Sequence, residues 1–224
     1  IILMSMFDGL TATITQYNHA VDADIEIVAR RGQTFNTEAI DMDRIRTTKG
    51  VEATTCYIEQ SVMASANGRR TTISLRGVDT SYCKVIPLDK HLVFGDFNRI
   101  KAGDLILSNT VASQLSLYGM GQPIDLYALN RKQISSLLPT SGIAHTTSHL
   151  GGEVITNTAN DATLAIGELG RTQHLLNYNN KLSCVAIKVA LGHDADEVRE
   201  RLQNVVGNDL EVRTRNQKNA STFA

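Results

Sequence analysis

Residues 51–79, VEATTCYIEQSVMASANGRRTTISLRGVD, predict two long β-strands joined by a tight turn. Asn67 and Gly68 lie between the strands, and a type I′ hairpin turn favours this dipeptide because both of its central positions need a positive φ. The flanking residues are rich in Val, Ile, Thr and Tyr, which are enriched in strands. The sequence therefore specifies this hairpin strongly, and the neighbouring elements can be placed relative to it.

Both ends of the chain show the same pattern of strand, helix and strand. Before the hairpin, ADIEIVAR (23–30) predicts a strand, and residues 39–50 predict a short helix that ends at Gly50. Near the C-terminus, residues 181–191 and 210–215 predict strands, and residues 193–207 predict a helix between them. Asp194 and Glu197 have the spacing of a capping box at the start of that helix. Two such βαβ units combine naturally into a split βαβ, ferredoxin-like layer.

The middle of the chain adds more strands. DLILSNTVASQLSLYGMGQPIDLY (104–127) predicts a strand, a helix capped by Ser108, and a second strand that continues to residue 129. Residues 130–148 are polar and contain Pro139, so they predict a long exposed loop. Two further strands and a short helix are predicted at residues 149–156, 162–167 and 168–178, in that order.

The predicted fold is therefore α+β, with two subdomains. Residues 1–63 and 178–224 form a discontinuous α/β subdomain of the ferredoxin-like, split βαβ type. Residues 64–177 form a β-rich subdomain that is inserted into it.

The first seventeen residues, IILMSMFDGLTATITQY, carry an apolar stripe with helical spacing, from Leu3 to Tyr17. Asp8 interrupts the apolar run, which is much shorter than the ~20 residues that span a bilayer. The stripe indicates an amphipathic surface helix or the last turns of a membrane helix.

Composition excludes one broad class of function. The chain has 224 residues, with 22 basic and 23 acidic side chains and only eleven Tyr and Phe. This balance offers neither the positive field nor the stacking platform that nucleic-acid binding requires. We expect no nucleic-acid partner.

No catalytic, cofactor-binding or metal-binding residues are predicted. The glycines Gly119 and Gly121 follow the helix at residues 109–117, whereas a phosphate site needs them before a helix. His145 and His149 are spaced as HxxxH, but they fall in the predicted loop without a glutamate between them, which is more typical of solvated histidines than of a metal site. The acidic pairs Asp22/Asp24 and Asp194/Asp196 are interpreted as helix caps and solvated faces.

Three cysteines allow two interpretations. Cys56, Cys83 and Cys184 form no CxxC motif, and buried free thiols are the simpler reading. Cys56 and Cys184 lie in predicted strands that would be neighbours in a split βαβ sheet, so a disulfide between them is the alternative.

Four segments, in order along the chain, resemble the extracytoplasmic domain of FtsX-like ABC-transporter permeases with a MacB-like periplasmic core. The segments are IILMSMFDGL (1–10), ISLRGVD (73–79), GDLILSNTVASQLSLYGMGQPIDLYAL (103–129) and LEVRTRNQKNASTF (210–223). The lipoprotein-releasing permeases of the LolC/LolE type are the most similar members. Gln122-Pro123 replaces the Gly-Asp that this family usually has before the strand at residues 124–129.

The resemblance implies a porter-like α/β subdomain at the two ends with an inserted, β-rich, sabre-like subdomain. It implies no catalysis and no cofactor in this domain, because a separate cytoplasmic ATPase subunit, coupled through membrane helices, uses the ATP. A second permease subunit or a second copy would complete the transporter, at the periplasmic side of the bacterial inner membrane. Both chain ends would lie close together at the membrane face.

The resemblance also directs attention to residues 130–148 as a contact for a periplasmic chaperone or a lipoprotein. The candidate contact residues there are Arg131, Leu137, Leu138, Pro139 and Ile143. This stretch has only Pro139 and no obvious match to the Pro-bearing hook with which one lipoprotein-releasing subunit grips its chaperone.

Two other classes of function stay open on the sequence. A small-ligand-binding or regulatory module of the ferredoxin-like type would have a pocket between its lobes. A hydrolase would bring Ser, His and Asp side chains together, although no GxSxG elbow is present.

Overall fold

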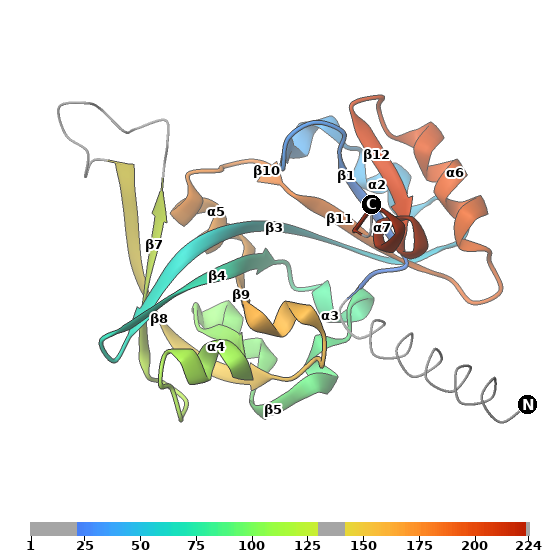
Figure 1. Cartoon of the computed structure of the whole chain (residues 1–224). Helices are drawn as coiled ribbons and strands as arrows, with labels where there is room; N and C mark the ends of the chain where they lie inside the picture. The colour runs from blue at the N-terminus through green and yellow to red at the C-terminus, as the bar shows by residue number, and fades with distance from the viewer. Residues whose placement is uncertain (1–21, 130–141, 223–224) are drawn as a thin grey trace, which may run out of the picture.

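The computed structural model describes residues 22–129 and 142–222, with residues 219–222 as backbone only. One twisted ten-stranded sheet runs through the molecule, in the order β12-β1-β11-β3-β4-β9-β6-β8-β5, and β7 pairs with both β3 and β8. Figure 1 shows β3 crossing from one end of the molecule to the other. The apolar N-terminal stripe lies outside the described residues.

The strands of this sheet are β1 (Ile25–Ala29), β3 (Val51–Ala66), β4 (Arg69–Val78), β5 (Leu92–Gly95), β6 (Leu105–Ser108), β7 (Pro123–Leu129), β8 (Ile143–Val154), β9 (Leu164–Glu168), β11 (Cys184–Val189) and β12 (Leu210–Thr214). β2 (Phe35–Asn36) and β10 (Lys181–Leu182) form a separate two-stranded sheet. The α-helices are α2 (Met42–Arg46), α3 (Tyr82–Val85), α4 (Asn109–Gln114), α5 (Leu169–Leu176), α6 (Ala195–Val205) and α7 (Arg215–Thr222). Short 3₁₀ helices cover Thr37–Ala39, Leu88–His91, Phe97–Ala102 and Ala159–Ala162.

The predicted hairpin is confirmed as β3 and β4. Their pairing runs from Ala66 opposite Arg69 to Tyr57 opposite Val78. The turn residues Asn67 and Gly68 have φ values of 50° and 74°, as a type I′ turn requires. With 16 residues, β3 spans about 50 Å at the usual strand rise.

At one end of the molecule the strands follow the order β12-β1-β11-β3, and all neighbours are antiparallel. Helices α2 and α6 cover one face of these strands, and a buried aliphatic core lies between them, including Ile25, Ile187 and Leu202. The predicted strands and the helix at residues 193–207 are confirmed here, with α6 slightly shorter than predicted. Figure 1 shows α6 and α2 together on this face.

The caps at the two ends of the molecule form as the sequence indicates, with one difference. Asp194 accepts hydrogen bonds from the backbone N–H groups of Asp196 and Glu197, and Ser108 accepts one from Val111 at the start of α4. In a capping box the Glu197 carboxylate would accept a hydrogen bond from the backbone N–H of Asp194. Here it forms an i,i+4 ion pair with Arg201 at 2.8 Å instead.

The predicted loop at residues 130–148 is wrong in its last part. Residues 143–148 belong to β8, which pairs with β7 from Leu129 opposite Ile143 to Pro123 opposite His149. Most of the polar side chains of this segment are exposed, and the sequence IAHTTSHL has too few apolar residues to signal a strand. Residues 80–103 contain α3, β5 and two 3₁₀ helices.

The strand predicted at residues 181–191 is interrupted at Ser183, between β10 and β11. The Ser183 N–H donates to the carbonyl of Tyr57, and the Ser183 hydroxyl accepts from the N–H of Glu59. The predicted boundary between residues 63 and 64 falls inside β3, which continues to Ala66, and the division into two subdomains stays a prediction. Within the ranges 22–129 and 142–222, no helix has both the length and the apolar character that crossing a bilayer requires.

Candidate functional site

The two ends of the described chain are joined by a group of ion pairs, which we call the terminal clasp. It consists of Asp22, Asp24 and Glu26 at the start and Arg213, Arg215 and Lys218 at the end. Lys218 Nζ lies 2.7 Å from Asp22 Oδ1 and 2.8 Å from Glu26 Oε1. Arg215 Nη2 lies 2.9 Å from Asp24 Oδ1, and Arg213 Nη2 lies 2.9 Å from Glu26 Oε2.

Backbone contacts add to the terminal clasp. The Arg215 N–H donates to the Asp24 carbonyl at 3.1 Å, and Arg215 Nη2 donates to the Asp22 carbonyl at 3.0 Å. Asp24 Oδ2 also accepts from the N–H of Val189 at the end of β11. The segment before β1, the end of β11 and the start of α7 are therefore held as one unit, and Figure 1 shows α7 beside the beginning of β1.

Burial makes the terminal clasp more than a surface ion-pair network. Glu26 is only 4% exposed. Burial acts to raise the pKa of its carboxyl, but the charges and hydrogen bonds of Lys218 and Arg213 outweigh it and hold the pKa below its ordinary value. Burial acts to lower the pKa of Lys218, but Glu26 and Asp22 outweigh this effect and raise it. Both groups stay charged at neutral pH.

The sequence reading of Asp22 and Asp24 as caps or solvated residues is wrong, because both carboxylates belong to the terminal clasp. The only local signal was that Asp22, Asp24 and Glu26 are spaced by two, which places side chains of an extended chain on one side. Their basic partners are 187 to 196 residues away, and a single sequence contains no signal that would pair them.

A second buried charge lies in the middle of the sheet, on β4. Arg76 on β4 is 7% exposed, and its Nη2 lies 3.0 Å from Glu59 Oε2 on β3. Its Nη1 donates to the hydroxyl of Tyr82 at 2.9 Å, and the guanidinium lies 4.7 Å from the centre of the Tyr57 ring. This group ties β3, β4 and α3 together in the middle of the molecule.

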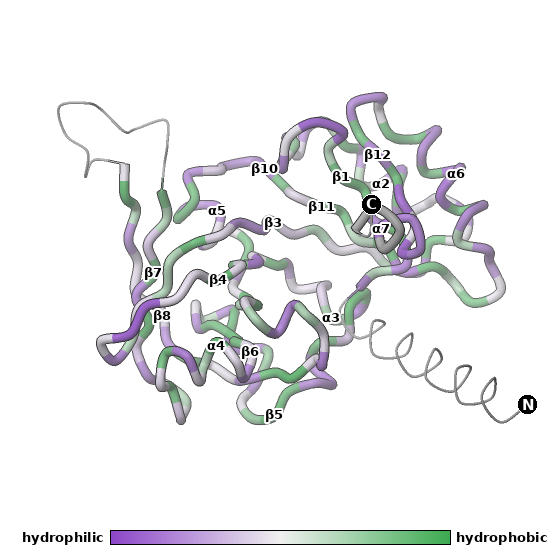
Figure 2. The backbone as a smooth tube through the Cα atoms, in the orientation of Figure 1, coloured by the Kyte–Doolittle hydropathy of each residue, from purple (hydrophilic) through white to green (hydrophobic). Residues whose placement is uncertain are grey.

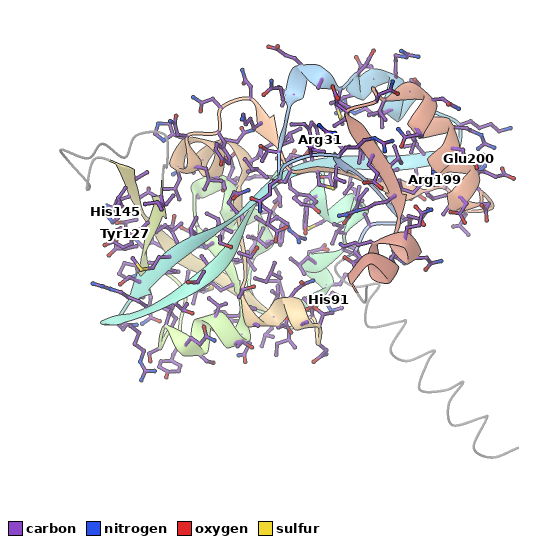
Figure 3. The ribbon with its side chains drawn as sticks, turned by 45° about the horizontal axis from the view of Figure 1, so that its top comes forward. Arg31, His91, Tyr127, His145, Arg199 and Glu200 are labelled. Atoms are coloured by element: carbon purple, nitrogen blue, oxygen red, sulfur yellow. The ribbon has the colours of Figure 1, made fainter. Side chains whose placement is uncertain are left out.

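At the far end from the terminal clasp, β7 and residues 143–149 of β8 form a hairpin that we call the β7–β8 arm. Its outer face carries Asp125, which accepts from Thr147 Oγ1 at 2.7 Å and lies 3.2 Å from His145 Nε2. The ring of Tyr127 lies against His145, with 4.8 Å between the ring centres. Figure 3 shows these two residues beside each other on the arm.

Of the five candidate contact residues, the structure describes Ile143. Arg131, Leu137, Leu138 and Pro139 lie outside the described residues. Ile143 is 49% exposed and pairs with Leu129, which is 60% exposed, so an apolar pair stands open at the outer end of the β7–β8 arm. Figure 2 shows the outer ends of both strands as hydrophobic.

The histidine pair has no metal-binding geometry. His145 and His149 lie in a β-strand, where four residues span about 13 Å, and they contact different carboxylates, Asp125 and Asp104. Across residues 22–129 and 142–222, no group of three or more His, Cys, Asp or Glu side chains could hold a metal ion.

The cysteines are free thiols, and the predicted proximity of their strands is confirmed. β3 and β11 are neighbours, but Cys56 pairs with Val185 and Cys184 pairs with Tyr57. Adjacent positions face opposite sides of a sheet, so the two sulfur atoms cannot form the alternative disulfide in this fold. Burial raises the pKa of the Cys56 thiol to about 12, aided by the neighbouring Asp79 carboxylate, and that of Cys83 to about 11. These thiols are protonated and poorly reactive at neutral pH.

Comparison with known proteins gives a consistent result. The family model described as MacB-like periplasmic core domain matches residues 1–205. No curated protein sequence matches the chain significantly. Among the solved structures that share its fold are three with 10–14% sequence identity.

The extracellular domain of the noncanonic ABC-type transporter YknZ from Gram-positive bacteria is similar with a TM-score of 0.59 at 14% identity, over 85% of this chain and 99% of that one. The periplasmic region of MacB from Actinobacillus actinomycetemcomitans also has a TM-score of 0.59, at 10% identity, over 91% of this chain and 94% of that one. A domain of a putative permease protein from Porphyromonas gingivalis has a TM-score of 0.50 at 10% identity, over 87% and 89% of the two chains.

Proposed function

Because the chain belongs to the MacB-like periplasmic core domain family, we propose that it is the extracytoplasmic domain of an ABC transporter permease. Its role would be to relay ATP-driven conformational change to a substrate outside the cytoplasm, in lipoprotein release or in efflux. The family match, over residues 1–205, and the shared fold with the YknZ and MacB domains support this role.

The terminal clasp is the observation that carries the proposal. A domain that is moved by membrane helices must receive the motion at its chain ends. The Lys218–Asp22 and Lys218–Glu26 ion pairs hold those ends together, so a displacement of either end moves β1 and α7 as one body. From β1 the connection runs through β11 and the long β3 to the β7–β8 arm.

We assign the two ends of the molecule to the two subdomains of such a domain. The strand order β12-β1-β11-β3, with α2 and α6 on one face, supports a ferredoxin-like, porter-type subdomain near the membrane. The strands from β4 to β9 would form the sabre-type subdomain, and its outer end would be the β7–β8 arm.

The partners follow from this arrangement. A separate cytoplasmic ATPase subunit would act through the membrane helices of the full-length protein, and a second permease subunit or a second copy would complete the transporter. The segment with Arg131, Leu137, Leu138 and Pro139, together with the exposed pair Leu129 and Ile143, would contact a periplasmic chaperone or a lipoprotein. The domain itself would perform no catalysis and hold no cofactor.

Crosslinking in the full-length permease, assembled with its ATPase in membrane vesicles, tests the relay. An Ile143→Cys variant carries one exposed thiol at the outer end of the β7–β8 arm, over a background of native thiols with raised pKa values. We expect its crosslinks to a second subunit or chaperone to change between the ATP-bound and vanadate-trapped states.

Glu26→Gln should then reduce this nucleotide-dependent change, because it weakens the terminal clasp while leaving the ATPase subunit intact. Glu52→Gln is the matched control, since Glu52 forms an exposed ion pair with Lys188. Crosslinks that do not respond to nucleotide in the unmodified protein would contradict the relay.

A further inference from the structure

The first half of β8 has an open edge, and we call the space beside it the slot. β6 has only four residues, whereas its parallel neighbour β8 has twelve. Leu105 at the start of β6 pairs with Leu150, so residues 143–149 of β8 extend past the beginning of β6. β7 pairs with one edge of this segment. Within the described part of the chain, no strand pairs with the other edge.

The backbone groups that face the slot can be identified from the hydrogen bonds. The N–H and the carbonyl of Leu150 bond toward the β7 side, at 2.9 and 2.8 Å. Directions alternate along a strand, so the N–H and carbonyl groups of Ile143, His145, Thr147 and His149 point to the open edge. Pro123, which has no N–H, stands opposite His149, as expected where the pair forms no hydrogen bond.

A cavity of about 630 Å³ runs along this edge, between β8 and α5. Its floor is apolar and consists of buried side chains from four elements: Leu75, Leu105, Leu126 and Leu175. The volume lies in the range of ligand-binding clefts. The side chain of His145 does not enter it, because His145 contacts Asp125 and Tyr127 on the opposite face of the arm.

The rim of the cavity carries two basic residues, Arg171 and His174, and one acidic residue, Glu168, whose carboxylate caps the start of α5 through the N–H groups of Gly170 and Arg171. Arg171 and His174 lie one turn apart on α5, on the same face as Leu175. A Cβ atom on Gly103 would approach Arg171 Nη1 to 2.4 Å, so the guanidinium rests directly over this glycine, which has a φ of +98°. Within the described residues, the Arg171 guanidinium forms no ion pair and no hydrogen bond. The Arg171 side chain is exposed beside the slot, so its donors can reach a ligand.

We propose that this slot binds an extended peptide segment of another protein, which adds a strand to the open edge of β8. Its backbone would satisfy the unpaired N–H and carbonyl groups, its alternate apolar side chains would lie on the leucine floor, and a carboxylate would meet Arg171 and His174. An acyl chain would fill the floor but would leave the strand edge unpaired, so the edge favours a peptide. The site does not depend on the relay role, because binding is measured without membrane or ATPase.

The probe is a fluorescein-labelled peptide, KTVTVTVL, with a free C-terminal carboxylate, titrated against the 224-residue chain by fluorescence anisotropy. We expect saturable binding and slowed amide hydrogen exchange at Ile143, His145, Thr147 and His149. Arg171→Ala should weaken binding about tenfold, and the C-terminal amide of the same peptide should lose this sensitivity. Arg70→Ala removes an exposed arginine at the β3–β4 turn and is the control. It should change neither the affinity for the carboxylate peptide nor the affinity for the amide peptide.

A pair of substitutions at one position tests the strand edge. Thr147→Val and Thr147→Pro both remove the hydroxyl that donates to Asp125, but only proline removes the N–H that faces the slot. We expect the valine variant to bind as the unmodified chain does and the proline variant to bind at least about tenfold more weakly. Circular dichroism of both variants verifies the fold.

Three results would overturn the proposal. The first is the absence of binding up to about millimolar peptide. The second is displacement of the peptide by laurate together with no protection of the edge amides, which would assign the cavity to an acyl chain. The third is full protection of those amides in the free protein, which would mean that the chain itself occupies the slot.

Discussion

Replacing Glu26 with glutamine tests how much the terminal clasp contributes to stability. Removing one partner of a fully buried ion pair typically costs about 3–5 kcal/mol. Glutamine keeps the shape and can still accept hydrogen bonds, and Lys218 keeps Asp22 as a partner at 2.7 Å. We therefore expect the free energy of unfolding at pH 7 to fall by about 2 kcal/mol.

Urea denaturation measures this change. With a slope of about 3 kcal/mol/M for a chain of this size, the midpoint should shift by about 0.7 M. The melting temperature should fall by about 4–8 °C. Glu52→Gln is the control, because the Glu52–Lys188 pair is about two-fifths exposed on both sides and such pairs contribute less than about 1 kcal/mol.

The pH dependence of stability tests the same carboxylate. The pKa of Glu26 is lower in the folded state than its ordinary value of 4.5, so the folded state binds the proton less tightly than the unfolded state. The stabilisation is complete above that ordinary value and is lost as the pH falls through the folded-state pKa. The difference between Glu26→Gln and the unmodified chain should therefore shrink below about pH 4.5. Two results would refute a stabilising role of the Glu26 ion pairs. One is an equal loss of stability in Glu26→Gln and Glu52→Gln at pH 7, and the other is a stability difference between Glu26→Gln and the unmodified chain that grows as the pH falls.

Three further predictions concern the hairpin, the central arginine and the thiols. Gly68→Ala should lower the free energy of unfolding by about 1 kcal/mol, because Gly68 has a φ of +74°. Gly207→Ala is the control and should not lower it, because Gly207 has no positive φ and a Cβ there would meet open space. Equal melting temperatures of the two variants would contradict this prediction. Arg76→Met should lower the free energy of unfolding by about 3 kcal/mol in urea denaturation, because the Glu59 carboxylate loses its charged partner and keeps only Ser74, and the buried Tyr82 hydroxyl loses its donor. A loss below about 1 kcal/mol would show that the central ion pair is not structural. With pKa values of about 12 and 11, Cys56 and Cys83 should react slowly with a disulfide reagent at pH 7 and quickly after unfolding, and a fast native reaction would show that they are not shielded.

Local chemistry accounts for the elements that the sequence predicted correctly. The Asn67-Gly68 turn and the caps Ser108 and Asp194 each depend on residues within three or four positions of one another. Such signals are readable from one sequence because the structure they specify is also local.

The missed features depend on distant parts of the chain. The segment at residues 143–148 is a strand because β7 and the core behind it provide a partner, and its own residues are mostly small and polar. The terminal clasp joins residues that are 187 to 196 positions apart. The slot beside β8 arises because β6 is shorter than β8. The residues that line the slot carry no sequence signal for this difference in length.

The continuity of β3 has a mechanical consequence. A loop between two lobes bends at almost no cost, but β3 is a hydrogen-bonded strand along its whole length, held by β11 near one end and by β4 and β7 near the other. The two ends of this protein can therefore move relative to each other only by twisting or flexing the sheet. Such a deformation stores elastic energy and returns it, so the molecule should behave as a torsion spring rather than as a hinge.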